Sequence, residues 1–133
     1  MAKAKANRTV TLVEELMAES SLVLSKAQAF QTMGMGETAQ TLWLSAASLQ
    51  ERIAPLLDAD GETLEAAVYR MSAASCYEKA GEPSRAVNLY QGALAGPLRD
   101  GTRKEVEEML AACLARLKAA ASGRKNRRVA PAS

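Results

Sequence analysis

The sequence predicts an all-α protein of five helices, and three observations lead to that prediction. Alanine is the commonest residue, aromatic residues make up only 4% of the chain, and the 133 residues include just 4 prolines. Alanine favours helices, whereas aromatic and β-branched residues are enriched in strands. Apolar residues also recur every three or four positions along most of the chain, which is the period of a helix face packed on a core. A chain of this length fits one domain.

The first helix is expected over residues 11–33, where Thr11 and Glu14 have the spacing of a capping box. Its start stays open on the sequence, because Thr9 or Asn7 could begin the helix equally well. A glycine turn follows, and the apolar period restarts for a second helix. Pro55 lacks the N–H that an interior helical residue donates, at a cost of about 3 kcal/mol. We therefore expect the second helix, from residue 39, to stop or kink near residue 54.

Three further helices follow the same period and are expected over residues 64–77, 86–94 and 102–121. Gly81 and Pro83 separate the first two of these helices, since glycine commonly follows a helix end and proline suits a helix start. Thr102 and Glu105 form the clearest capping box of the chain and are expected to open the last helix.

Basic residues gather at the two ends of the chain. Residues 1–8 carry 3 basic residues and residues 122–133 carry 4, with no acidic residue in either segment. Residues 9–121 hold the other 10 basic residues and all 15 acidic residues, a net charge of −5. We therefore expect one helical domain over residues 9–121, a basic N-terminal tail before it and a basic, disordered C-terminal tail after it.

The residue types argue against an enzyme. Histidine is absent, which removes the commonest general base and the commonest metal ligand. Paired acids such as Glu14 and Glu15 lie near helix starts, where they interact favourably with the helix dipole. We expect no catalytic residue, no cofactor and no metal site. Cys76 and Cys113 fall at apolar positions of helices and are expected to be buried free thiols in a reducing compartment, the cytoplasm. No apolar run is long enough to span a membrane.

Shifting the sequence by 47 residues aligns the first predicted hairpin with the second. The rare residues coincide, as Phe30 with Tyr77, Trp43 with Tyr90, and Gly34 with Gly81. Small residues coincide as well, as Ala27 with Ala74, Ala39 with Ala86, and Ala46 with Ala93. Aromatic residues and glycines in one register indicate an internal repeat, in which small side chains let two helices approach and an aromatic ring fills the space beside them.

This pattern resembles the tetratricopeptide repeat. The stretch ASCYEKAG over residues 74–81, continued by RAVNLY over residues 85–90, matches the signature of that family closely. The resemblance covers roughly residues 20–98 and implies two antiparallel helical hairpins followed by a capping helix. The 47-residue spacing exceeds the family's repeat of about 34 residues, and it is similar to that of the longer-helix adaptors of the SNAP type.

The resemblance also implies a binding surface. Members of the family bind peptides or helices in a groove lined by the first helix of each hairpin, here the first and third helices. The expected partner-binding residues are therefore Leu24, Gln28, Gln31, Val68, Met71, Ser75, Glu78 and Lys79. This set lacks the lysines and asparagines with which some members hold a terminal carboxylate, so no such clamp is expected.

The sequence leaves two functions possible. The first is a non-enzymatic adaptor or scaffold that binds another protein through this groove, or that assembles with itself to cover the end of a short repeat array. The second is a protein whose basic tails contact the phosphates of nucleic acid or of an acidic membrane. The contacts in that case would come from Arg124, Lys125, Arg127 and Arg128.

Overall fold

The computed structural model describes the backbone of residues 2–129 and the side chains of residues 11–123. Within this part of the chain there are five helices and no strand, which confirms the predicted all-α class. The helices are α1 (Ala2–Thr32), α2 (Gly36–Ala59), α3 (Thr63–Lys79), α4 (Pro83–Leu94) and α5 (Asp100–Val129).

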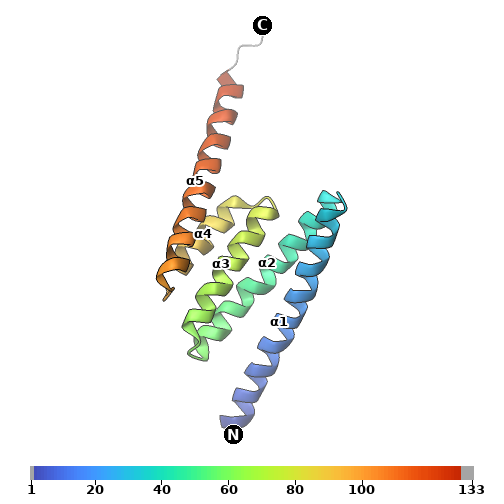
Figure 1. Cartoon of the computed structure of the whole chain (residues 1–133), viewed down its shortest axis with the longest axis vertical. Coiled ribbons are helices and arrows are strands. Elements are labelled where there is room, and N and C mark those ends of the chain that lie inside the picture. The colour runs from blue at the N-terminus through green and yellow to red at the C-terminus, as the bar shows by residue number, and fades with distance from the viewer. Residues whose placement is uncertain (1, 130–133) are drawn as a thin grey trace.

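Each helix runs antiparallel to the preceding one and packs against it, so the helices follow one another across the molecule in chain order (Figure 1). α2 lies between α1 and α3, and the two long helices α1 and α5 stand at opposite ends of the array. α5 extends well past the ends of α3 and α4. The array therefore has two open ends.

Three of the four turns have the same construction. A glycine with φ of 78°, 82° or 80° follows α1, α2 and α3, respectively Gly34, Gly61 and Gly81. The next residue donates its N–H to a carbonyl five residues back, in the pairs Met35 to Phe30 (2.9 Å), Glu62 to Leu57 (2.8 Å) and Glu82 to Tyr77 (2.8 Å). This is the Schellman ending, which needs a left-handed residue that glycine adopts without strain. It reverses the chain and produces the antiparallel hairpins.

Gly81 also leaves room for a contact from α2. A Cβ atom at this position would lie 2.7 Å from Nε2 of Gln40. That amide nitrogen donates a hydrogen bond to the Ala80 carbonyl (2.8 Å), which ties α2 to the end of α3. A side chain at position 81 would therefore break the contact as well as strain the turn.

Two predicted helix boundaries are wrong in the first hairpin. α1 begins at Ala2, so Thr11 lies inside the helix and does not open it. α2 does not stop near residue 54, one of the two outcomes expected there, but continues through Pro55 to Ala59. The helix persists because Ile53 and Leu57 on either side of the proline are buried. Burial of such side chains contributes about 1.5–3 kcal/mol each, which offsets the cost of the proline.

The bounds of α5 also differ from the prediction. The helix begins at Asp100, so Thr102 lies in its first turn and not at its cap. Arg103 donates from Nη1 to the Leu94 carbonyl (2.7 Å) and from Nη2 to the Gly96 carbonyl (2.9 Å), and so pairs carbonyl groups at the end of α4. At its other end α5 continues to Val129, so residues 122–129, which we expected in a disordered tail, are helical.

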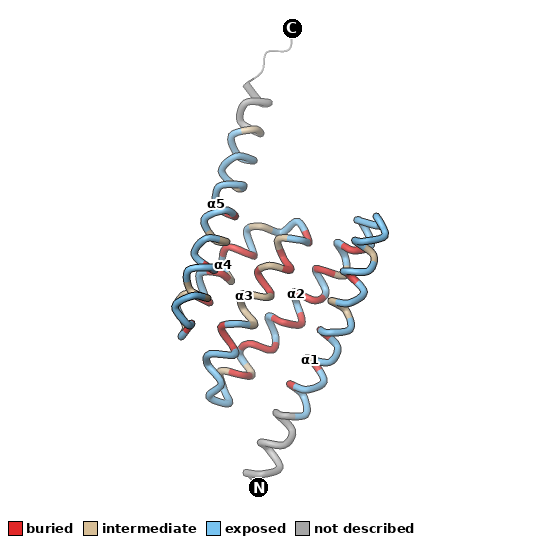
Figure 2. The backbone as a smooth tube through the Cα atoms, in the orientation of Figure 1, coloured by how far each residue is buried: buried red, intermediate tan, exposed pale blue. Residues whose placement is uncertain are grey.

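The core lies along α2, α3 and α4, whereas α1 and α5 each bury one face only (Figure 2). One cluster joins all five helices, and a smaller one joins the first part of α1 to the second part of α2 and to Ala66 of α3. Buried alanines line most helix contacts, and three aromatic side chains, Trp43, Tyr77 and Tyr90, fill the space between them. The small and large residues thus pack as the repeat pattern implies.

Both cysteines are buried free thiols, as expected. Cys76 lies 3.5 Å from Oε1 of Gln50, a buried polar side chain of α2. Burial raises the pKa of Cys76 to about 11, against the opposing effect of the Lys79 charge. The thiol therefore stays protonated at neutral pH and packs as a small apolar group.

We expect Trp43→Ala to destabilise the protein by about 3–5 kcal/mol, because it removes a side chain that is 3% exposed from between α1, α2 and α3. Urea unfolding measures the change, and Leu44→Ala, at an exposed neighbouring position on α2, serves as the control. A urea unfolding curve of the Trp43 variant that matched wild type would contradict this packing.

Candidate partner-binding surface

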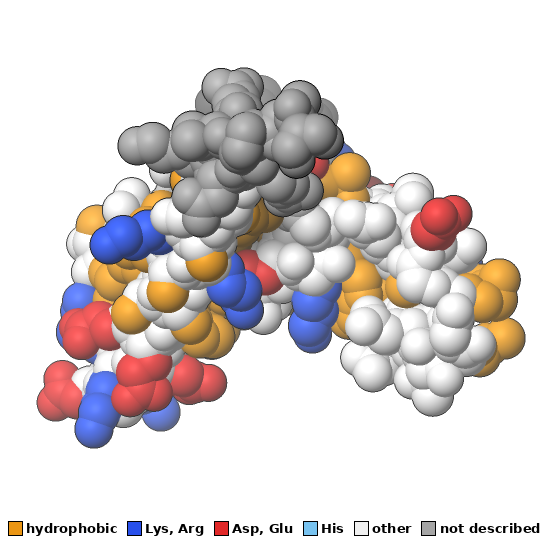
Figure 3. Space-filling view, turned by 90° about the horizontal axis from the view of Figure 1, so that it is seen from above, with side chains coloured by type: hydrophobic (Ala, Val, Ile, Leu, Met, Phe, Trp, Pro, Cys, Tyr) orange, Lys and Arg blue, Asp and Glu red, His pale blue; other side chains and the backbone are white. Residues whose placement is uncertain are grey.

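Two hollows lie side by side along one face of the array. The α1–α3 hollow has a volume of about 610 Å³ and is lined by Leu24, Ser25, Gln28, Ala29, Trp43 and Lys79. The α3–α5 hollow has a volume of about 600 Å³ and is lined by Ser75, Glu78, Lys79, Gly81, Pro83, Arg116, Leu117 and Ala120. Lys79 belongs to both. Figure 3 shows the surface hollowed between the α5 side and the α1 side, with charged side chains of both signs at the hollow.

Trp43 of α2 lies beneath the α1–α3 hollow. Its indole Nε1 donates a hydrogen bond to Oε1 of Gln31 on α1 (2.7 Å). The ammonium group of Lys79 on α3 lies 4.3 Å from the centre of the indole ring, which is a cation–π contact. One aromatic side chain thus joins three helices, and its polar atom is paired although the ring is buried.

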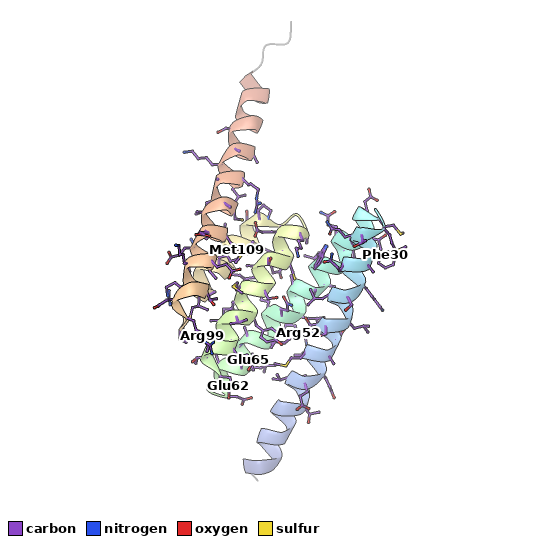
Figure 4. The ribbon with its side chains drawn as sticks, in the orientation of Figure 1. Phe30, Arg52, Glu62, Glu65, Arg99 and Met109 are labelled. Carbon is purple, nitrogen blue, oxygen red and sulfur yellow. The ribbon has the colours of Figure 1, made fainter. Side chains whose placement is uncertain are left out.

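Tyr90 of α4 has the equivalent place in the second hairpin. Its hydroxyl donates to Oε2 of Glu78 on α3, and the other oxygen of this carboxylate contacts the guanidinium of Arg116 on α5. The Sδ atom of Met109, which points from α5 toward the array in Figure 4, lies 3.8 Å from the Tyr90 hydroxyl. Burial raises the pKa of Tyr90, so the phenol remains a donor at neutral pH.

The two hairpins therefore repeat the same arrangement. Gln31 and Glu78 are 47 residues apart, as are Trp43 and Tyr90, and in each hairpin the aromatic residue of the second helix donates to the polar residue of the first. A basic residue of the next helix along the face then lies against this pair, Lys79 in the first case and Arg116 in the second. The pairs differ in charge, because a neutral amide accepts in one and a carboxylate in the other.

The expected partner-binding residues do not line one groove but are mostly divided between the two hollows. Leu24, Gln28 and Lys79 line the α1–α3 hollow, while Gln31 holds the indole of Trp43. Ser75 and Glu78 line the α3–α5 hollow instead.

Besides Gln31, two of the expected residues line neither hollow. Met71 packs against the core. Val68 lines a smaller hollow of about 340 Å³ near the start of α5. Glu65 and Arg99 line the same smaller hollow and are neighbours in Figure 4.

The sequence interpretation missed the part played by α5. Arg116, Leu117 and Ala120 line the α3–α5 hollow, although the last helix was expected only to cap the array. The spacing carried a partial signal. Arg116 follows the buried Cys113 by three residues, so it lies close to the buried face of α5. The tail residues proposed for phosphate contact, Arg124, Lys125, Arg127 and Arg128, lie outside the described side chains.

The described residues offer little for a metal site, a reactive side chain or a membrane span. No three histidine, cysteine, aspartate or glutamate side chains among them lie close enough together to hold a metal ion. Burial raises the pKa values of Cys76, Cys113 and Tyr77, which favours their neutral forms. Within the same part of the chain, no helix has an apolar stretch long enough to cross a membrane.

Comparison with known proteins gives no match: no protein-family model, no curated protein sequence and no solved structure matches this chain.

We expect Glu78→Ala to destabilise the protein by about 1–3 kcal/mol, because the Tyr90 hydroxyl, on a side chain that is 0% exposed, loses its acceptor. Glu78→Gln keeps an acceptor, as Gln31 provides for Trp43. It loses only the ion pair with Arg116, which is 63% exposed, so it should cost under about 1 kcal/mol. Urea unfolding compares the two variants. Equal losses would show that the hydrogen bond to Tyr90 is not what Glu78 contributes.

Proposed function

We propose that this chain is a non-enzymatic interaction module, an adaptor or scaffold that binds a peptide or helix of another protein in the α1–α3 hollow. The observation that carries the proposal is the hollow itself, about 610 Å³ in volume and open between Leu24, Gln28 and Lys79. It is an open surface depression, suited to a segment of another protein, and it combines apolar, amide and charged groups. Trp43 forms its floor and, being held by Gln31 and covered by Lys79, keeps the residues around the hollow in place.

The repeated hairpins support this proposal. Repeat arrays stack similar units and use the face that the units share for binding, and here the two aromatic–polar pairs and the two large hollows recur from one hairpin to the next. We therefore keep the tetratricopeptide-like assignment as part of the proposal. Two free, buried cysteines fit a reducing compartment, so we place the protein in the cytoplasm.

Assembly with a second copy is a variant of the same proposal. Large apolar side chains are exposed at both ends of the array, including Met33 (67% exposed) and Leu22 on the α1 side and Leu114 on α5. Covering such side chains is favourable at about 25 cal/mol per Å² of apolar surface. Light scattering on the purified chain would distinguish a monomer from a dimer.

The test is to block the hollow without disturbing the fold. Ala29→Trp fills the α1–α3 hollow, and Ala111→Trp, at an exposed alanine of α5 that lines neither hollow, is the matched control. We expect a discrete set of proteins to be retained from nuclease-treated lysate by full-length wild type and by the control, and to be lost with Ala29→Trp. Quantitative mass spectrometry measures this loss.

Two results would count against the proposal. Retention of the same proteins by all three baits would show that binding does not use the α1–α3 hollow. Retention of proteins from untreated lysate alone, with none left after nuclease treatment, would favour contact with nucleic acid through the basic residues of the chain, and that binding falls steeply with salt.

A further inference from the structure

The charges of the two aromatic–polar pairs are not balanced in the same way. In the second hairpin Arg116 contacts Glu78, so the cation has a carboxylate partner. In the first hairpin Lys79 faces Trp43 and a hydrogen-bonded amide, both of which are neutral. Lys79 makes no ion pair with any acidic group of the described residues. The α1–α3 hollow therefore contains one uncompensated positive charge.

The rest of this hollow is neutral. Ser25, Gln28 and Ala29 line its α1 side, and Leu24 and Trp43 give it apolar surface. An ammonium group has three donors, and the contact with the indole face leaves donors for a further partner. A carboxylate placed beside Lys79 would pair with this exposed cation, while an apolar neighbour in the same segment would cover Leu24.

The neighbouring α3–α5 hollow adds positive charge on the α5 side of Lys79. Lys79 also lines the α3–α5 hollow, whose charged residues are two cations and one carboxylate that is already engaged. Beyond Ala120, α5 continues as a helix that projects from the array, and no acidic residue follows Glu108 in the sequence. The charged residues that line the two hollows, Lys79, Arg116 and Glu78, therefore sum to a net charge of +1, which favours an acidic partner.

We propose that the segment bound in the α1–α3 hollow is acidic, with an aspartate or glutamate side chain that pairs with Lys79 and a large apolar side chain that packs on Leu24, above Trp43. This inference rests on the proposed function, because it names the chemistry of the partner of the same hollow. It involves one lysine and a side-chain carboxylate, so the partner needs no free C-terminus. A phosphate backbone fits less well, since strong binding to nucleic acid needs several cations and this hollow offers one.

The first experiment selects the ligand without assuming its charge. Phage-displayed random peptides of roughly 15 residues, the length of about four helical turns, are selected on the immobilised full-length chain. Peptides that also bind the Ala29→Trp variant are removed. We expect the remaining peptides to be enriched in a large apolar residue accompanied by aspartate or glutamate.

The second experiment measures the contact with Lys79. The strongest selected peptide, amidated at its C-terminus, is titrated into full-length protein, and the fluorescence of the single tryptophan reports binding beneath the hollow. We expect Lys79→Gln to weaken binding about fivefold, as for a well-placed ion pair, and Lys79→Arg to restore most of it. Lys104→Gln, at an exposed lysine of α5 that lines neither hollow, should have no effect. Replacing the peptide's acidic residue by its amide should weaken binding to wild type but not to Lys79→Gln.

The outcomes separate this inference from the proposed function. Selected peptides that lack acidic residues, or whose affinity is unchanged by Lys79→Gln, would overturn the acidic partner and leave the hollow as a binding site. Failure to select any peptide that distinguishes wild type from Ala29→Trp would overturn both. Displacement of the peptide by a DNA duplex of about two helical turns, with equal dependence on Lys79, would show that the site takes phosphates instead.

Discussion

The hydrogen bond from Trp43 to Gln31, and its counterpart from Tyr90 to Glu78, fixes how the two helices of each hairpin are turned against each other. A buried indole or phenol must pair its polar atom, and leaving it unpaired costs about 1–3 kcal/mol. The observed rotation of the first helix presents the acceptor, Gln31 or Glu78, to that atom. The same pairs also position a basic residue of the next helix on that face. Lys79 of α3 lies over the Trp43 ring, and Arg116 of α5 contacts Glu78.

The alanines and the hollows follow from this constraint. Buried alanines such as Ala27 and Ala74 let neighbouring helices approach closely, and the aromatic rings fill what remains of the interior. Where two helices of the same face are separated by the width of the helix between them, the side chains do not close the gap, and a hollow remains over the aromatic–polar pair. Packing and the candidate binding surface are therefore consequences of one repeated arrangement.

The helical period predicted the class and number of helices, and the aligned glycines and aromatic residues predicted the register of the two hairpins. The ends of the helices were harder to predict, because tertiary packing overrides local signals: burial on both sides carries α2 through Pro55, and α5 begins ahead of its capping-box threonine. For the candidate site, Leu24, Gln28 and Lys79 were identified from the sequence, whereas Arg116 was not. Apolar periodicity shows which face of α5 is buried, but not that a charged residue at its edge meets Glu78.

The position of Lys79 over Trp43 can be tested most directly by nuclear magnetic resonance of the full-length protein. The geometry predicts that the side-chain methylene protons next to the Lys79 ammonium are shifted upfield by the indole ring current and show nuclear Overhauser effects to the ring. It also predicts slow solvent exchange of the indole N–H, which is bonded to Gln31. Lysine resonances at the positions of a solvent-exposed side chain, together with a rapidly exchanging indole N–H, would contradict the arrangement on which the fold and the binding surface depend.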